Sequence, residues 1–509
     1  MIKDQSNQRN ETLPTASENI RGRLKAAALL LVLLLTPFVV ARAQSGSKLR
    51  IEDRVVHTAT ETIPAEVGHF EVPQNYHHPS GKAITLAFIR FKSTEVNPGA
   101  PILYLAGGPG TSGITYATGP KFEPYLTLRQ FGDVIALDQR GTGLSEPNLT
   151  CPDRFVYPLN KPADREQLTR ACQRFAHDCA LYWRGKGVDL KDYNTEASAD
   201  DVKALADILG VKQVRLFGAS YGSHLGLSII RRHPEIVERA VLGGIEGPDQ
   251  TIKLPANVES HLSEVSRLIA TDSAAGKLLP NFRLLLRKTI REVSRKPISL
   301  ELSNPQVPTE HVKVQLSAID IQLIAGSLLG RRPTIELIPR VFGPARHGDY
   351  SAIASYVPEV RATEISAMGA VMDCASSVSN HRWRIIKRQA SKTVLGTLLD
   401  FPLPEWCRAW GVPRLPKSFR APVRSNMPVL FVEGTLDGQT PLSNAIEVRR
   451  GFSKGALFTI SNAGHDGSMF QSSPELIEAI NRFIAGAPTS DQRFKAPPLH
   501  FSLPGGTTR

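Results

Sequence analysis

The sequence predicts an α/β fold in which a mainly parallel β-sheet is covered by helices on both faces and has an inserted, mostly helical domain. Short apolar runs alternate with helical patterns before residue 250 and again after residue 420. This alternation is typical of a mainly parallel sheet. Residues 251–420 interrupt it with successive helical patterns. A chain of 509 residues is also too long for one simple core, which favours a large domain with an insertion.

The chain is organised around residues 218–222, with the sequence Gly-Ala-Ser-Tyr-Gly, between an apolar run at 214–217 and a helical pattern at 223–232. Small residues on both sides let the backbone turn sharply from strand to helix, which holds Ser220 in a strained elbow at the carboxyl edge of a sheet. The backbone N–H of Tyr221 is then a candidate donor to the oxyanion formed on attack. A tight buried turn without catalytic function would explain the same five residues. A catalytic interpretation therefore requires partner residues elsewhere in the chain.

Residues 1–43 are expected to form a cleaved secretory signal. A polar segment with basic residues at its end precedes the apolar stretch 26–40, and Ala-Arg-Ala follows, which predicts cleavage after Ala43. An uncleaved membrane anchor is the alternative, but the stretch is shorter than the ~20 residues that a spanning helix needs. No later run is long and apolar enough to span a bilayer, so we expect an exported protein, either periplasmic or extracellular.

The composition is basic, with a formal net charge of +13. The positive residues are scattered, and no run of five and no recognisable nucleic-acid module occurs. We therefore expect a solvated or envelope-attracted surface and no nucleic-acid partner.

The five cysteines show no metal-ligand spacing, so neither a metal nor a cofactor is expected. In an exported chain they meet an oxidising compartment in which disulfides persist. Cys374 and Cys407 are alone in the second half of the chain and are expected to pair. One of the other three, at positions 151, 172 and 179, is left over.

Residues 44–250 are expected to form the first part of the core. Alternation over residues 48–93 predicts antiparallel strands joined by a turn at 79–81. A buried strand at 101–106 then runs into Gly-Gly-Pro-Gly, a turn whose exposed N–H groups make Gly108 the second candidate oxyanion donor. A plain tight turn is the alternative explanation of these glycines.

Further along, a strand at 133–137 ends in Asp-Gln-Arg-Gly-Thr-Gly. A helix is expected to begin near Ser198, with Asp200 and Asp201 in its first turn. After the serine, a strand at 237–242 leads to a loop that contains Glu246.

The second half of the chain is expected to form an inserted cap at 251–420, the second part of the core at 421–487 and a surface tail at 488–509. The cap contains four helical patterns, at 262–270, 280–295, 320–329 and 334–346, and one possible hairpin, at 298–302 and 312–316. In the core, a strand at 428–432 leads through Glu433 to Asp437, and a strand at 456–460 precedes His465. Helices are expected at 443–452 and 474–485.

Ser220, Asp437 and His465 follow one another in the order of the α/β-hydrolase triad. His465 would take the proton of Ser220 and return it to the leaving group, while Asp437 would orient the imidazole and stabilise its charged form. Of the 13 histidines, only His465 follows the strand that comes after a strand-end acid. Asp466 is a poorer candidate, because the triad acid belongs on the preceding strand's loop.

Together these motifs resemble the proline iminopeptidase and tripeptidyl aminopeptidase family of α/β-hydrolases, over nearly all of the chain after the signal. The motifs are residues 107–110, 138–143, 218–222, 434–441 and 464–465. The resemblance implies an α/β-hydrolase fold with a helical cap, and an acyl-enzyme mechanism that releases residues from free peptide amino termini. It also implies a second disulfide, Cys151 to Cys179, with Cys172 as the odd thiol. Ala106 departs from the family, because many proline iminopeptidases have His there.

An enzyme specific for free amino termini must pair the substrate's ammonium group with carboxylates. Glu246 and Glu433 are the candidates, although either could be a solvated loop acid and Glu246 could instead pair with a cap arginine. The substrate is then a peptide. An esterase or acyl-transferring enzyme with the same triad, acting on small esters, is the alternative, and an inactive binding protein is a more remote one. A serine at position 220 excludes the branches whose nucleophile is Asp.

Overall fold

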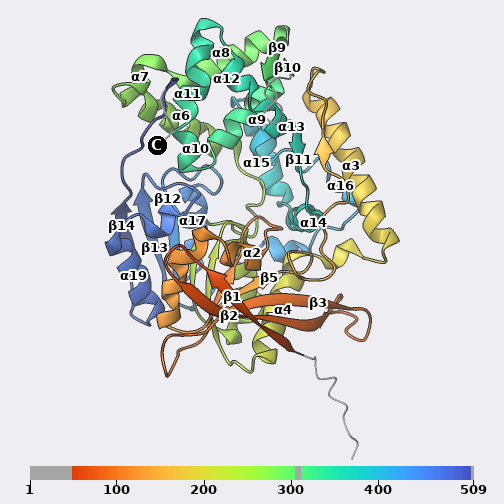
Figure 1. The fold of residues 1–509 in the computed structure, drawn as a ribbon, viewed down its shortest axis with the longest axis vertical. Coiled ribbons are helices and arrows are strands. Elements are labelled where there is room, and N and C mark those ends of the chain that lie inside the picture. The colour runs from red at the N-terminus through yellow and green to blue at the C-terminus, as the bar shows by residue number, and fades with distance from the viewer. Residues whose placement is uncertain (1–48, 304–310, 506–509) are drawn as a thin grey trace, which may run out of the picture. The chain divides into compact units, whose positions relative to one another are not determined.

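The computed structural model describes residues 49–303 and 311–505, and the predicted signal segment lies outside this range. A ten-stranded sheet forms the centre of the fold (Figure 1). Its strands are β1 (Arg50–His57), β2 (Thr62–Pro73), β3 (Ala83–Phe91), β4 (Ile102–Leu105), β5 (Val134–Asp138), β7 (Val214–Ala219), β8 (Val237–Gly243), β12 (Val429–Gly434), β13 (Gly455–Ser461) and β14 (Gln492–Lys495).

The strand order is β1-β2-β3-β5-β4-β7-β8-β12-β13-β14. The first three strands pair antiparallel, and β3 also pairs antiparallel with β5. Every pair from β5 to β14 is parallel. The predicted mainly parallel sheet with an antiparallel entry is therefore confirmed, and the carboxyl ends of β7, β8, β12 and β13 lie at one edge.

Helices cover both faces of this sheet, and each face has its own hydrophobic cluster. On one face pack α3 (Arg165–Gly185), α4 (Thr195–Ile208), α5 (Tyr221–Arg232) and α17 (Leu442–Arg449). On the other pack α2 (Gly113–Ala117), the 3₁₀ helix η1 (Pro120–Gln130), α18 (Ser468–Gln471) and α19 (Pro474–Ile484). This two-faced covering matches the predicted fold class.

Between β8 and β12 the chain forms a mostly helical insertion, which we call the cap. Its helices up to residue 361 share a separate hydrophobic cluster, whereas buried residues at 367–374 and 406–410 belong to a cluster of the core. The cap contains α6 (Pro255–Thr271), α7 (Ala275–Leu278), α8 (Phe282–Arg295), α9 (Ala318–Leu328), α10 (Arg332–Ile335), α11 (Ile338–Phe342), α12 (Ser351–Ala354), α13 (Val357–Arg361), α14 (Ala367–Ser376), α15 (Asn380–Ala390) and α16 (Cys407–Trp410). The predicted hairpin is present as β9 (Ile298–Ser303) and β10 (His311–Leu316).

Three local expectations differ from the structure. The helix expected at 334–346 is broken into α10, α11 and a 3₁₀ turn, because prolines at 333, 339 and 344 each start a new segment. Helix α4 begins at Thr195, capped by the Asn194 side chain, rather than near Ser198. Helix α3, with 21 residues, has no counterpart among the predicted elements.

The first half of the chain also contributes to the cap. Strand β6 (Phe155–Val156) pairs with β11 (Ala362–Thr363), and α3 lies beside α16 and α14 (Figure 1). The expected boundary at residue 250 therefore does not separate the two parts cleanly.

The carboxyl-terminal segment is more ordered than the expected surface tail. Strand β14 extends the sheet by pairing parallel with β13. Beyond it, the carbonyls of Pro497 and Pro498 accept hydrogen bonds from the Arg332 guanidinium at 2.8 and 2.6 Å. The segment thus connects the sheet edge to cap helix α10.

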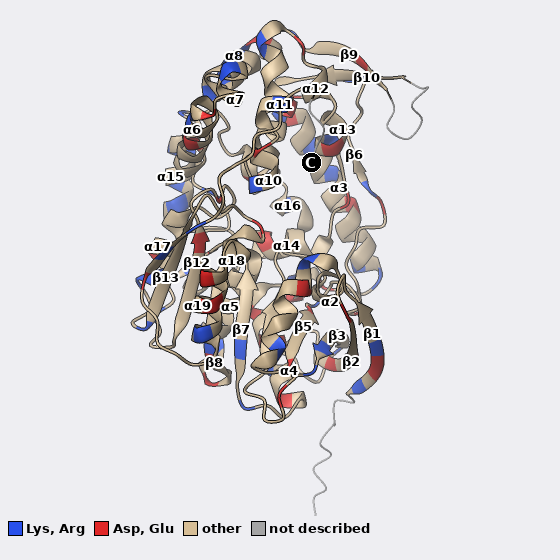
Figure 2. Cartoon of the chain, turned by 60° about the vertical axis from the view of Figure 1, so that its left-hand side comes forward, with Lys and Arg blue, Asp and Glu red and all other residues tan. Residues whose placement is uncertain are grey.

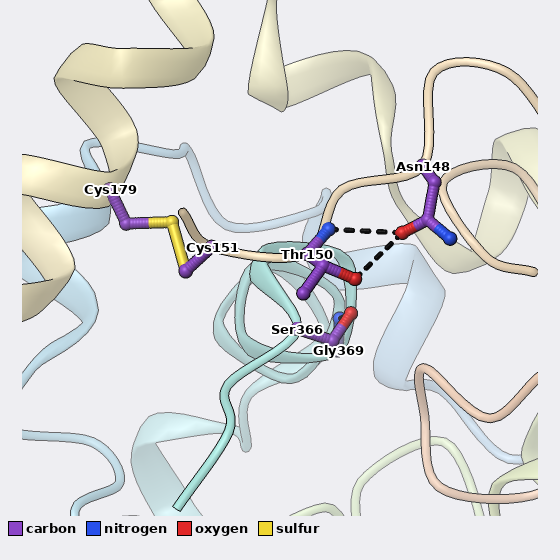
Figure 3. The surroundings of a disulfide bond; sticks show 6 residues. All are labelled: Asn148, Thr150, Cys151, Cys179, Ser366 and Gly369. Atoms are coloured by element: carbon purple, nitrogen blue, oxygen red, sulfur yellow. Dashed lines mark hydrogen bonds between the residues drawn. A yellow bond between two sulfur atoms is a disulfide. The ribbon is translucent and has the colours of Figure 1, made fainter. Parts of the chain in front are cut away.

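The structure contains both predicted disulfides. Cys374–Cys407 joins α14 to α16, and Cys151–Cys179 joins the loop after β5 to α3. Figure 3 shows the second bond close to Thr150 and to Ser366, which precedes α14. Cys172 is a free, buried thiol, and burial raises its pKa to about 12.

Charged residues are distributed over many elements, with Lys and Arg interspersed among Asp and Glu (Figure 2). Among residues 49–303 and 311–505, no helix combines the length and apolar character required to cross a membrane.

Candidate active site

Ser220 occupies a strained turn between β7 and α5. Its backbone has φ 58° and ψ −130°, a region that a non-glycine residue rarely adopts. A Cβ at Gly218 would lie 2.6 Å from the Gly222 carbonyl oxygen, and one at Gly222 would lie 2.1 Å from that of Leu105. Only glycine fits at both positions, which explains the Gly-x-Ser-x-Gly pattern and fixes Ser220 at the sheet edge.

His465 and Asp437 form a short contact at the same edge, with 2.6 Å between His465 Nδ1 and Asp437 Oδ2. The other carboxylate oxygen, Oδ1, accepts the backbone N–H groups of Gln439 and Thr440 at 2.8 and 2.7 Å. Burial opposes ionisation of Asp437, but the adjacent imidazole and the Thr440 hydrogen bonds bring its pKa below the ordinary value. An ionised Asp437 can therefore orient His465 and stabilise its protonated form.

The His465 ring lies next to the backbone that holds Ser220. The Ser220 N–H donates to the Gly243 carbonyl at 3.0 Å, and a Cβ at the following Gly244 would lie 3.0 Å from His465 Cε1. Within the described residues the Ser220 hydroxyl has no hydrogen-bond partner, and such catalytic contacts often tighten only when substrate binds. Asp466 is engaged elsewhere, because it accepts the backbone N–H groups of Arg332 and Ser468.

The glycine-rich turn after β4 lies over the serine. A Cβ at Gly107 would come within 3.2 Å of the Ser220 Cβ. In the described part of the chain, the backbone N–H groups of Gly108 and Tyr221 have no acceptor, so both are free to bind an oxyanion. Asp138 holds the turn in place by accepting from Ser112 Oγ at 2.7 Å and from the Ile114 N–H at 2.9 Å.

Glu433 is fully buried behind this site. One carboxyl oxygen accepts the Ile245 N–H at 2.8 Å, and the other accepts the Gly434 N–H at 3.2 Å. Burial and the nearby Asp437 charge raise the pKa of Glu433 well above its ordinary value. The expected amine-binding role does not fit this position, because Glu433 has 0% of its surface exposed.

Glu246 lies partly exposed in the loop after β8, and its backbone N–H donates to Ser223 Oγ at 2.9 Å. Its neighbour from the cap is Asp373 on α14, whose pKa is raised well above its ordinary value by burial and by the Glu246 charge. Lys253 is close by and is paired with Asp400 at 2.9 Å. Asp373 was not among the residues expected from the sequence, although it is the one acid in α14, whose other residues are apolar or small.

Glu246 and Asp373 lie close enough for the Glu246 charge to raise the pKa of Asp373, and a bound ammonium group would neutralise such a pair. Two groups that can carry positive charge also lie close by: His224, whose Nδ1 is 3.7 Å from Glu246 Oε1, and Lys253, which is paired with Asp400. Glu246 is provided by the core and Asp373 by the cap, so a cation bound there would contact both parts. Among the described residues, no three His, Cys, Asp or Glu side chains are grouped so as to hold a metal ion.

Comparison with known proteins identifies the fold family. Residues 100–471 match the model of the alpha/beta hydrolase fold family. The tripeptidyl aminopeptidase of Streptomyces coelicolor is 24% identical over 450 residues, which cover 83% of this chain and 81% of that protein. Serine protease Hip1 of Mycobacterium tuberculosis is 29% identical over 196 residues, 36% of each chain. The proline iminopeptidase of Neisseria gonorrhoeae is 25% identical over 176 residues, covering 35% of this chain and 42% of that one. Because the family match spans well over half of the chain, this protein belongs to the alpha/beta hydrolase fold family.

Proposed function

We propose that the chain is an exported serine aminopeptidase, which releases residues from the free amino terminus of peptides through an acyl-enzyme. The observation that most supports this is the 2.6 Å contact between His465 and Asp437 beside the strained Ser220. The peptidase names of the similar proteins agree with this proposal.

In the proposed reaction, Ser220 Oγ attacks the carbonyl carbon of the scissile peptide bond and its proton passes to His465 Nε2. The Gly108 and Tyr221 N–H groups bind the resulting oxyanion. The C–N bond then breaks, and His465 gives the proton to the departing amine, which leaves an ester on Ser220. Water deprotonated by His465 hydrolyses this ester, and Ser220 recovers its proton.

Glu246 and Asp373 are the proposed amine-binding groups. Desolvating an ammonium ion is costly unless carboxylates pair with it, and the cap limits how far a peptide can extend past this point. The pair replaces the Glu246 and Glu433 set expected from the sequence.

Labelling with a fluorophosphonate tests the nucleophile. Wild-type protein is expected to be labelled and Ser220→Ala is not. Because triad members act as a unit, Ser220→Ala and His465→Ala are each expected to reduce turnover on the order of 10⁴-fold or more without unfolding the chain. A folded wild type that stays unlabelled would support the inactive binding protein instead.

Acetylation of the substrate tests the aminopeptidase assignment. The enzyme is expected to cleave peptides with a free amine and to reject the same peptides once they are acetylated. Equal rates on both forms would favour an esterase or an endo-acting hydrolase with the same triad.

A further inference from the structure

A cavity of about 300 Å³ lies between α3, α9, the β11 region and the segment 398–406. Its walls are mostly aliphatic and aromatic side chains, among them Leu323, Phe401 and Trp406. No Lys, Arg, His, Asp or Glu side chain lines it. Apart from Gln439, whose backbone N–H holds Asp437, the proposed amine site and the triad use none of the wall residues. The apolar character of the wall therefore has no role in the chemistry described so far.

Two residues that line the cavity connect it to the candidate active site. Gln439 lines one end, and its backbone N–H donates to Asp437 Oδ1 at 2.8 Å. Ile365 lines the other end, and the next residue, Ser366, lies against the oxyanion turn: a Cβ at Gly110 would be 3.1 Å from Ser366 Oγ. Figure 3 shows Ser366 and Gly369 together, with the 151–179 disulfide nearby. A substrate bound at Ser220 would therefore have this cavity beside it.

The lining determines which chemical group fits. An uncharged, largely apolar wall favours an apolar group, at roughly 25 cal/mol per Å² of surface removed from water. An aromatic side chain buries about 150–250 Å² and would gain most. Gln439 adds one polar function at the edge, because its carboxamide has no hydrogen-bond partner among the described residues and is free to bind a substrate's backbone.

We propose that this cavity binds a bulky apolar side chain of the substrate, next to the bond that is cleaved, and that the Gln439 carboxamide hydrogen-bonds the substrate's backbone. This inference rests on the proposed function and adds a substrate class to it. The enzyme would act on peptides with a free amine at one end of the site and an aromatic or long aliphatic residue adjacent to the scissile bond.

Ser327 offers a way to fill the cavity without touching the triad. It lies exposed on α9, lines the cavity, and its hydroxyl donates only to the Ile324 carbonyl at 2.9 Å. Ser355 is a matched control, because it is also exposed and its hydroxyl donates to the Ala352 carbonyl at 2.9 Å. Ser355 lines none of the described cavities.

The experiment compares two free-amine peptide amides that differ only in Phe or Ala before the scissile bond. Wild type and Ser355→Trp are expected to prefer Phe by about 10-fold or more in kcat/KM. Ser327→Trp is expected to lose this preference, mainly through KM for the Phe substrate, with the Ala substrate little changed. If Ser327→Trp does not fold, Thr363→Trp, at another exposed lining position, serves in its place.

The cavity assignment would be overturned if folded Ser327→Trp kept the wild-type ratio of kcat/KM for the Phe peptide over the Ala peptide. A ratio kept because kcat/KM falls equally on both peptides counts in the same way. If the wild type refuses peptides, p-nitrophenyl acetate and p-nitrophenyl 3-phenylpropionate replace them. If Ser327→Trp then lowers the ratio of kcat/KM for the phenylpropionate over the acetate, the cavity binds apolar groups although the aminopeptidase proposal has failed. A wild type inactive on both classes contradicts the proposed function and the cavity assignment with it.

Discussion

Glu433 and Asp437 are neighbouring carboxyl groups whose pKa values shift in opposite directions, Glu433 upward and Asp437 downward. The difference arises from their partners. Both carboxyl groups are buried and each accepts two backbone N–H groups. Asp437 also contacts His465 and accepts the Thr440 hydroxyl, whereas Glu433 lies beside the Asp437 charge. One negative charge is therefore kept next to the imidazole, and Glu433 is a buried support that favours its neutral form beside Asp437.

Glu433→Gln tests this support. A fold that raises a carboxyl pKa prefers the neutral form, so Glu433 contributes less stability as pH rises above the value of its unfolded side chain, about 4.3. Glutamine does not titrate. The free energy of unfolding of Glu433→Gln relative to wild type is therefore expected to be higher at pH 8 than at pH 5, on the order of 1 kcal/mol. Denaturant unfolding at the two pH values measures this.

A control variant and one contradicting result complete the Glu433 test. Glu433→Ala leaves the Ile245 N–H without its partner and is expected to cost about 1–3 kcal/mol at either pH. A difference between Glu433→Gln and wild type that does not change with pH would show that Glu433 is ionised throughout.

Glu246→Gln tests the amine site. Removing one carboxylate from a buried ion pair is expected to cost about 2–4 kcal/mol of transition-state binding on peptides with a free amine. Small neutral esters have no ammonium group, so their hydrolysis is expected to stay nearly normal. The ratio of kcat/KM on the two substrate classes is the measurement, and equal losses on both would remove Glu246 from amine binding.

Sequence patterns predicted the residues of the elbow and the acid–His pair because each lies at a fixed place relative to a core strand. They did not anticipate the proposed amine-binding pair, Glu246 and Asp373. Whether a strand-end acid such as Glu433 faces solvent or the interior depends on what packs above it. Asp373 lies on a cap helix, and its approach to Glu246 follows from the cap's docking, which the local sequence does not encode.

At the level of elements, Asp138 connects the end of β5 to the start of α2. It accepts from Ser112 Oγ, from the Ile114 N–H and from the Leu144 N–H, and Gln139 Nε2 donates to the Ala106 carbonyl at 3.2 Å. The Asp-Gln-Arg-Gly stretch was recognisable in the sequence only as a motif. In the structure its side chains hold the glycine-rich turn after β4, because they fix both ends of that turn.

Asp138→Ala is therefore expected to disturb catalysis without touching substrate. A misplacement of the Gly108 donor by about 1 Å can cost on the order of 10²-fold in kcat. We expect kcat to fall and KM to change little, with fluorophosphonate labelling slowed but still present. Asp133→Ala, at the other end of β5, is the control and is expected to keep its kcat. A normal kcat in folded Asp138→Ala would show that the turn holds its shape alone.

The strands were predicted more reliably than the helices, because parallel core strands form short, continuous apolar runs. Helix α3 was missed although it has 21 residues, since most of its surface is polar and its buried side includes Cys172 and Cys179. Asp201, expected in the first turn of α4, instead forms a buried pair with Arg140 at 2.6 Å. That pair joins α4 to the end of β5. Its two residues are 61 positions apart, so the local sequence does not indicate that they meet.

Over the whole molecule, the last segment of the chain connects the core to the cap near the histidine. The Arg332 guanidinium donates to the carbonyls of Pro497 and Pro498. The backbone N–H of the same residue donates to Asp466, which directly follows His465. Strand β14 fixes the other end of the segment on the sheet. The His465 loop therefore lies between the core, cap helix α10 and the carboxyl-terminal segment.

Arg332→Met tests whether this connection positions His465. The substitution keeps an unbranched, mostly apolar side chain but removes the guanidinium and its charged hydrogen bonds, which are worth about 1.5–3 kcal/mol each. We expect lower thermal stability and a lower kcat, and truncation after Ala487 is expected to act in the same direction and more strongly. Arg331→Met is the control, because Arg331 is exposed and, within the described residues, its side chain makes no salt bridge or hydrogen bond; its carbonyl accepts the Thr334 hydroxyl, which the substitution leaves in place. If Arg332→Met lowers the melting temperature but leaves kcat and its pH profile unchanged, the carboxyl-terminal segment stabilises the fold without positioning the histidine.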